Sequence, residues 1–122
     1  MQEYDETMDD AVSMLKALAD RNRLRIVNAL GRRGELCACE ITGMLGISAA
    51  TVSRHMGVLI GARLVVGRKD GRWVHYRLVT AEHSRESVLA WVRDVLSEDG
   101  TAERDLTYLD SAPGAPSVCP AS

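Results

Sequence analysis

The chain has 122 residues, of which 46% are hydrophobic and 26% are charged. This length suits one small domain and is short for a catalytic barrel or a doubly wound nucleotide fold, and the composition argues against intrinsic disorder. The net charge of −2 hides an asymmetry: residues 21–80 hold eleven Lys or Arg and three acids, a charge of +8, whereas residues 1–20 and 81–122 carry −5 each. A basic centre between acidic ends predicts a polyanionic partner, with a solvated charged surface as the alternative.

No apolar run reaches the roughly 18 residues that a membrane helix needs, and the first residues are acidic, unlike those of a secretory signal. We therefore expect a cytoplasmic protein that makes no use of a membrane. Three cysteines in a reducing compartment do not favour a disulfide framework, which leaves metal binding or redox chemistry for the thiols. Cys37 and Cys39 are separated by one residue, and Cys119 lies near the end of the sequence.

Four helices are expected before the first strand. Apolar residues recur at helical spacing over residues 7–18 and again from residue 21 to about residue 30, where glycines and arginines typical of a helix end follow. A short helix around Ile41 and Leu45 is closed by Gly46. Ser48 can then cap a helix over residues 49–61 by accepting a hydrogen bond from an early backbone N–H.

One face of the helix over residues 49–61 is unsuited to a protein core, because it carries small residues, hydroxyl groups and an arginine. Such a surface fits the major groove of DNA, and a short helix, a glycine-containing turn and a second helix of this kind form the helix-turn-helix pattern. A polar packing role is the alternative for His55. The residues expected to face the groove are Ser48, Ala49, Ala50, Thr51, Ser53, Arg54 and His55.

Alternating hydrophobic residues follow over residues 64–69 and 72–79, on either side of Asp70 and Gly71. This period of two predicts strands, and Asp-Gly predicts a two-residue hairpin turn. Because Arg68, Lys69 and Arg72 surround the tip, we expect a basic wing that contacts the DNA backbone beside the recognition helix.

A last helix is expected over residues 81–98, with Thr80 as its cap. Its apolar face, which includes Trp91 and Val95, is wide for so short a chain, so we expect a homodimer through the first and the last helix. Packing within the monomer is the alternative. The fold class expected is mainly α with a β-hairpin wing: a winged helix-turn-helix domain over residues 1–99, followed by a flexible tail over residues 100–122.

Several ordered blocks resemble the ArsR/SmtB family of winged-helix repressors. They are LKALADRNRLRIVNAL, ELCACEI, GISAATVSRHMGVLIGARLV and RKDGRWVHYRL, and the resemblance covers about residues 10–96. It implies a homodimeric repressor, not an enzyme, that binds an inverted repeat in double-stranded operator DNA and leaves it when a metal or metalloid binds. Two positions depart from the family pattern. Arg63 stands where a glycine commonly precedes Leu-Val, and Thr42 stands where the arsenic sensors often carry a third cysteine.

Cys37 and Cys39 resemble the thiolate site of the family's arsenic and cadmium sensors. On a regular helix, residues two apart point about 200° from each other, so binding of one ion by both requires the backbone there to leave helical geometry. Thiolates select soft ions, and no histidine or carboxylate cluster is expected nearby. The resemblance implies three thiolates for As(III) or Sb(III). The resemblance also implies that cadmium and lead sensors draw further cysteines from the N-terminal arm, and residues 1–36 contain none, which favours arsenite or antimonite as inducer. Because Thr42 stands at the place of the third cysteine, Cys119 from the tail of either subunit is the candidate third ligand.

Several alternatives stay open. The same repressor could sense cadmium, lead, reactive sulfur or oxidants through Cys37 and Cys39, or these cysteines could simply be packed as small apolar residues. Cys119 could be an uninvolved tail thiol. A thiol oxidoreductase would require Cys-x-x-Cys at a strand-to-helix junction, which the sequence lacks. A protein-binding scaffold leaves the basic centre unexplained. Zinc at the last helix is not favoured, because the histidines His55, His75 and His83 are scattered along the chain.

Overall fold

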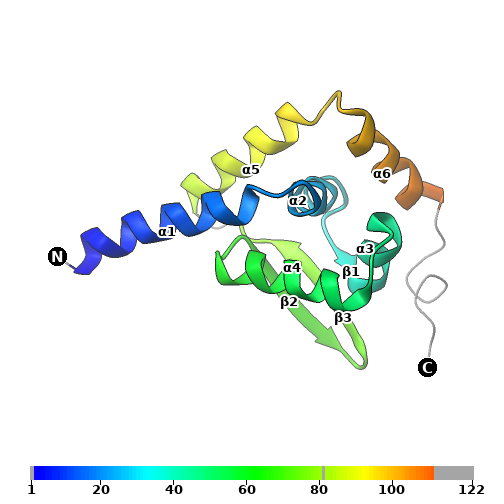
Figure 1. The fold of residues 1–122 in the computed structure, drawn as a ribbon, viewed down its shortest axis with the longest axis horizontal. Coiled ribbons are helices and arrows are strands. Elements are labelled where there is room, and N and C mark those ends of the chain that lie inside the picture. Colours follow the sequence, from blue (N-terminus) through cyan, green and yellow to red (C-terminus); the bar gives the residue numbers. More distant parts are fainter. Residues whose placement is uncertain (1, 81, 112–122) are drawn as a thin grey trace.

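The computed structural model describes residues 2–80 and 82–111. In Figure 1, α2 lies at the centre, α1 projects to one side, α5 and α6 arch over it, and the hairpin of β2 and β3 projects at the lower edge. None of the helices in the described ranges has the length and apolarity to cross a lipid bilayer. A mainly helical fold with a β-hairpin wing is confirmed. The elements in chain order are α1 (Gln2–Leu18), α2 (Arg21–Arg33), β1 (Leu36–Cys37), α3 (Ala38–Leu45), α4 (Ala49–Gly61), β2 (Val65–Asp70), β3 (Trp73–Leu78), α5 (His83–Val95) and α6 (Gly100–Ser111).

Capping residues set the ends of α2 and the start of α4. The Asp20 carboxylate accepts a hydrogen bond from the backbone N–H of Arg23 at 3.1 Å, which begins α2. Gly34 ends α2 with a φ of 88°, a few residues later than the sequence predicts. The Ser48 hydroxyl accepts from the backbone N–H of Thr51 at 3.1 Å, as predicted, and α4 covers the predicted residues. The recognition helix therefore begins where its cap residue dictates.

The hydrophobic core surrounds α2 and joins every element that positions the helix-turn-helix. Ile26 and Leu30 from α2, Ile41 from α3 and Leu59 from α4 are at most 1% exposed, and they pack with apolar side chains from α1, β2 and α5. Each such burial contributes about 1.5–3 kcal/mol. The two helices of the helix-turn-helix are therefore held by a shared core, and their outer faces are left for other partners.

The three strands form one antiparallel sheet in the order β1-β3-β2. In the hairpin, Asp70 pairs with Trp73, so the loop consists of Gly71 and Arg72, one residue later than predicted. Gly71 has a φ of 67°, a conformation that glycine adopts without steric cost. The sequence did not predict β1. This short strand, which ends at Cys37, pairs with β3 and is the third strand of the wing sheet.

The C-terminal third differs most from the prediction. The helix expected over residues 81–98 is the shorter α5, and its N-cap is Glu82 rather than Thr80. The flexible tail expected from residue 100 is wrong for residues 100–111, because these form α6, which packs on α2 and α3. The half-buried Arg25 guanidinium pairs with the buried Asp105 carboxylate at 2.8 Å across this contact. Residues 112–122, and Cys119 with them, lie outside the described residues.

Candidate nucleic-acid interface and cysteine site

The two faces of α4 are chemically distinct. Val52, Met56 and Leu59 are at most 1% exposed and fix the helix to the core. The opposite face has no large apolar side chain near the helix start, so the backbone can approach the floor of a DNA groove. The residues predicted for this face that the structure leaves exposed or half-buried are Ser48, Ala49, Ala50, Thr51, Ser53 and Arg54.

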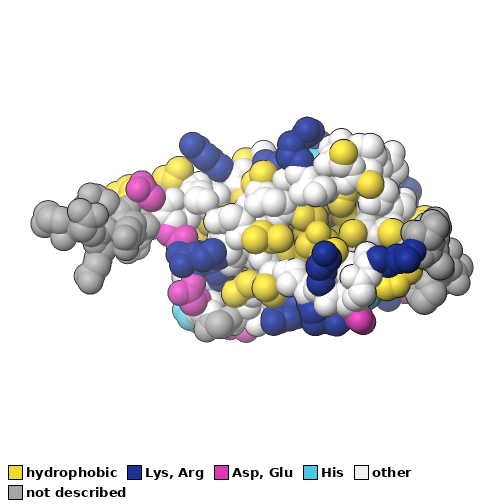
Figure 2. Space-filling view, turned by 90° about the horizontal axis from the view of Figure 1, so that it is seen from below, with side chains coloured by type: hydrophobic (Ala, Val, Ile, Leu, Met, Phe, Trp, Pro, Cys, Tyr) yellow, Lys and Arg dark blue, Asp and Glu magenta, His cyan; other side chains and the backbone are white. Residues whose placement is uncertain are grey.

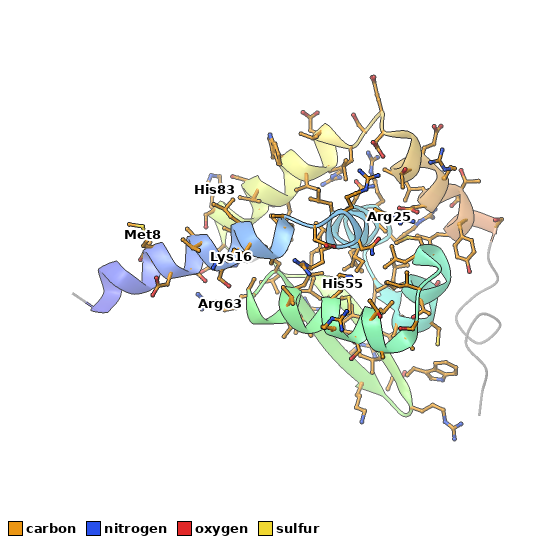
Figure 3. The ribbon with its side chains drawn as sticks, in the orientation of Figure 1. Met8, Lys16, Arg25, His55, Arg63 and His83 are labelled. Atoms are coloured by element: carbon orange, nitrogen blue, oxygen red, sulfur yellow. The ribbon has the colours of Figure 1, made fainter. Side chains whose placement is uncertain are left out.

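His55 does not share the exposed face, contrary to the prediction that it contacts DNA. The residue is 8% exposed and lies between α4 and α2 (Figure 3). Its Nδ1 lies 3.1 Å from Nη1 of Arg23, whose Nε donates to the carbonyl of Ala17 at 2.6 Å. Burial and this chain of hydrogen bonds, which ties α4 to the junction of α1 and α2, favour the polar packing role.

The wing adds cations beside α4. Arg68, Lys69 and Arg72 are exposed around its tip, as predicted. Arg68 already has acidic neighbours, since its Nη2 donates to Glu35 Oε1 at 3.0 Å and its Nη1 lies 3.9 Å from an oxygen of Asp70. Figure 2, seen from the side of α4 and the wing, shows Lys and Arg side chains spread over this face with fewer acidic side chains among them. Such a face suits a polyanion.

The two cysteines lie on different elements. Cys37 ends β1 and is the N-cap of α3, with extended angles of φ −84° and ψ 161°. Its N–H donates to Glu40 Oε1 at 2.9 Å, which closes a capping box. Cys37 is 1% exposed, whereas Cys39 in the first turn of α3 is half-buried. The backbone at Cys37 has thus already left the helical geometry that would separate the two thiols.

The environment of Cys37 favours its protonated form. Burial raises the pKa of the thiol, and the nearby Glu40 carboxylate raises it further, while the backbone N–H groups of Glu40 and Cys39 oppose this increase. An ion that binds the thiolate must therefore displace a proton, so its affinity increases with pH.

The described part of the chain does not bring together three His, Cys, Asp or Glu side chains close enough to hold a metal ion. Cys39 is disulfide-bonded in this structure, so it can act as a soft donor beside Cys37 only after reduction. The third predicted ligand, Cys119, is outside the described residues. One histidine, His75, is the cross-strand partner of Cys37. No periodic signal in the sequence could have revealed this pairing, since two residues of β1 are too few to show alternation.

The end of α6 lies beside α3. The Tyr108 hydroxyl packs so closely on Gly43 that a Cβ at that position would clash with it. Gly43 follows Thr42, the position at which the family pattern often has its third cysteine. An ion pair between Arg33 and Asp110 holds the last turn of α6 against α2. The segment that contains Cys119 therefore leaves the described structure close to the helix that carries Cys39.

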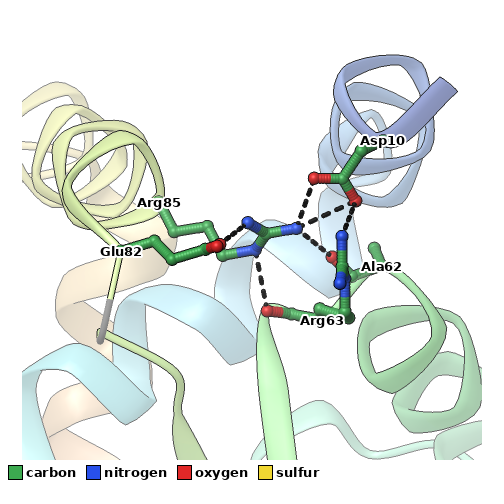
Figure 4. A network of polar contacts seen from close by, with 5 residues as sticks. All are labelled: Asp10, Ala62, Arg63, Glu82 and Arg85. Carbon is green, nitrogen blue, oxygen red and sulfur yellow. Dashed lines mark hydrogen bonds and ion pairs between the residues drawn. The ribbon is translucent and has the colours of Figure 1, made fainter. Parts of the chain in front are cut away.

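Sequence reasoning also missed a charge network that joins α4 to α1 and α5 (Figure 4). Arg85 is 2% exposed, its Nη2 donates to Asp10 Oδ2 at 2.8 Å, and its Nε donates to the carbonyl of Arg63 at 3.0 Å. Glu82 pairs with the same guanidinium. Arg63 itself pairs with Asp10 at 2.8 Å. The network holds the junction between the recognition helix and the wing, and an arginine on a half-buried helix carries no sequence signal for such a role.

Comparison with known proteins agrees with this geometry. Residues 20–66 match the family described as bacterial regulatory protein, arsR family. The chain is 37% identical over 94 residues to the arsenical resistance operon repressor of Escherichia coli (strain K12), which covers 77% of this chain and 75% of that protein. It is 44% identical over 61 residues to the cadmium resistance transcriptional regulatory protein CadC of Listeria innocua serovar 6a, which covers 50% of this chain and 51% of that protein.

Among solved structures, the fold is similar to the homodimeric winged helix-turn-helix DNA-binding domain Mb0332 from Mycobacterium bovis. The TM-score is 0.65 at 28% sequence identity, over 79% of this chain and 86% of that chain. The winged helix-turn-helix architecture expected from the sequence is thereby confirmed.

Proposed function

Because this chain belongs to the arsR family of bacterial regulatory proteins, we propose that it is a repressor released from its operator by arsenite or antimonite. It is a DNA-binding transcriptional repressor rather than an enzyme. The observation that carries the proposal is the position of Cys37, which is buried at the head of α3, the helix that packs directly on the recognition helix α4. One helix, α3, therefore separates this thiol from the DNA-facing helix α4.

The DNA-binding surface consists of the start of α4 and the tip of the wing. In a dimer with two-fold symmetry, the α4 helices insert into successive major grooves about 34 Å apart, which requires an inverted repeat. The wing cations contact the flanking backbone. The residues proposed for these contacts are Ser48, Ala49, Ala50, Thr51, Ser53 and Arg54 for the groove, and Arg68, Lys69 and Arg72 for phosphates.

The inducer site comprises Cys37, Cys39 and Cys119 of the same subunit. Seven residues lie between Ser111, the end of α6, and Cys119, and an extended chain over these eight Cα–Cα steps spans up to about 28 Å. Because α6 ends beside α3, this reach suffices without the partner subunit. Arsenous acid would exchange its three hydroxyl groups for three thiolates, with the three thiol protons leaving in three water molecules.

The proposed function is tested by following labelled promoter DNA by fluorescence anisotropy as arsenite is added to the reduced protein. We expect release at substoichiometric to equimolar arsenite. Cys119→Ser should lower the arsenite stoichiometry and the thiolate absorption, whereas unchanged values would remove Cys119 from the site. DNA binding that arsenite leaves untouched would contradict the metalloid inducer.

Cadmium is a second candidate inducer, and one observation favours it. His75 is the cross-strand partner of Cys37, so an imidazole lies on the strand next to the thiol, and cadmium accepts sulfur and nitrogen donors. The side chains of Cys37, Cys39 and His75 do not form a metal site as they stand, so cadmium binding would require them to move. The similarity to CadC extends over 61 residues and does not decide the ion. A parallel cadmium titration separates the two candidates, because His75→Ala should weaken release by cadmium and leave release by arsenite unchanged.

A further inference from the structure

The strand that carries Cys37 is part of the wing. Leu36 pairs with Tyr76 and Cys37 pairs with His75, so β1 forms one edge of the sheet whose other two strands are the hairpin. His75 also pairs with Arg68 on its other side. Side chains of directly opposed residues point to the same face of a sheet. The three strands therefore carry one row of side chains, formed by Cys37, His75 and Arg68. The last member of this row, Arg68, is a cation proposed to contact DNA.

A side-chain contact spans the same row. Glu35 immediately precedes β1, and its Oε1 accepts a hydrogen bond from Arg68 Nη2 at 3.0 Å. Residues two apart in an extended segment point to the same side, so Glu35 shares the face of Cys37. The Glu35 and Arg68 side chains are 39% and 54% exposed, so the pair lies at the surface where the guanidinium can also meet a phosphate. Glu35 thus fixes where the guanidinium stands before DNA arrives.

A ligand that bridges the two cysteines must act on this arrangement. Cys37 belongs to β1 and Cys39 to α3, so one ion bound by both draws the strand and the helix toward a single point. Cys37 is held by the β3 ladder on one side and by the Glu40 carboxylate at 2.9 Å on the other. The strand cannot shift at Cys37 without disturbing its pairing with β3 or its contact with Glu40.

We propose that Glu35 is a positioning residue for Arg68, and that inducer binding at Cys37 weakens DNA binding through β1 and the wing. The inference rests on the proposed function and adds the path by which the cysteine site reaches DNA. It differs from a path through α3 and α4 alone, because it requires the hairpin to respond to the inducer.

The first test compares Glu35→Gln with Lys69→Gln as a matched control. Lys69 is an exposed wing cation whose cross-strand partner is Val74, a residue that does not pair with β1. The Kd for operator DNA is measured by anisotropy with and without arsenite, and the ratio of the two values reports the coupling. For Lys69→Gln we expect weaker DNA binding in both states and an unchanged ratio. For Glu35→Gln we expect the ratio to fall by about threefold or more, with arsenite binding unchanged. A wild-type ratio for Glu35→Gln overturns its positioning role.

The second test reads the wing directly by hydrogen exchange of the protein without DNA. Arsenite should change the protection of amides in residues 74–78 of β3, and Glu35→Gln should leave that response smaller at the hairpin than at α3. If arsenite releases DNA from the wild-type protein but alters exchange only in α3 and α4, the path through β1 is wrong while the proposed function stands. If neither arsenite nor cadmium releases DNA, the proposed function itself fails, and this inference fails with it.

Discussion

At the scale of single residues, the structure explains one departure from the family pattern. Arg63 is the one non-glycine residue with positive φ in the described ranges, at 62°, and it stands at the position discussed above where the family pattern has glycine. A left-handed backbone costs an ordinary residue about 1–2 kcal/mol. The Arg63 side chain offsets part of this cost through its contact with Asp10 at 2.8 Å. The conformation is needed because it turns the chain from α4 into β2.

This interpretation predicts an unusual order of stability for two variants. Arg63→Gly and Arg63→Ala both delete the ion pair with Asp10, so the difference between them isolates the backbone. We expect Arg63→Gly to be more stable than Arg63→Ala by about 1 kcal/mol, the reverse of their order in a regular helix. Urea denaturation of both variants measures the free energies of unfolding. Equal stabilities would show that the positive φ at residue 63 costs alanine no more free energy than glycine.

Asp10 predicts a pH dependence of stability. Hydrogen bonds from Arg63 and then Arg85 hold the pKa of this carboxyl below its usual range. Because the folded pKa lies below the unfolded one, the stabilisation is present above about pH 4 and is lost as the pH falls through the folded pKa. Asp10→Asn should therefore show a smaller loss of unfolding free energy between pH 6 and pH 3 than the wild type. Asp9→Asn, at an exposed neighbour, is the control and should follow the wild-type curve.

At the scale of elements, what the sequence predicts depends on whether the signal is local. The bounds of α4 follow from the Ser48 cap and the spacing of buried residues, so they could be predicted. The strand β1 could not, because it is two residues long and pairs with a segment far along the chain. The sequence predicts a tail at α6, because the segment beyond Gly100 contains all three prolines and has no sustained hydrophobic period. The packing of α6 depends on Arg25, which is distant in the sequence. The inward orientation of His55 was likewise not predictable from its own helix, because its partner Arg23 lies on α2.

The attachment of α6 can be tested through its two ion pairs. Arg25 donates to both oxygens of Asp105, at 3.0 Å and 2.8 Å, and Asp105 is 4% exposed. Removing one partner leaves the other charge unpaired, so Asp105→Asn should destabilise the protein by about 1–3 kcal/mol, given that Arg25 is partly exposed. Asp110→Asn, which breaks the exposed pair with Arg33, should cost less than about 1 kcal/mol. Thermal and urea unfolding measure both values. Equal small effects would mean that apolar packing alone holds α6.

At the scale of the whole molecule, the apolar surface left on one side of the fold is too large for a lone subunit. The side chains of α1 and α5 that share it include Met8, Leu15, Trp91 and Val95, each more than half exposed. A groove of about 560 Å³ between Leu15 and Leu18 of α1 and Val88 and Trp91 of α5 lies within it. The N-terminal half of α1 also projects beyond the rest of the fold (Figure 1), where a second copy can contact it. We expect a two-fold dimer to bury this surface and to pair the two recognition helices.

The expected dimer interface can be tested at Trp91, because this residue is 62% exposed and borders the groove between α1 and α5. Burial of large aromatic side chains dominates interface energies, so Trp91→Glu should raise the dimer dissociation constant by at least about tenfold. Val66→Ala, which truncates an exposed apolar side chain on β2, is the control and should leave the dimer intact. Sedimentation velocity measures the association.

Because a dimer spans both half-sites of an inverted repeat, Trp91→Glu should also weaken binding to the full operator far more than binding to a single half-site. Dimerisation at wild-type strength in Trp91→Glu would move the interface away from α1 and α5.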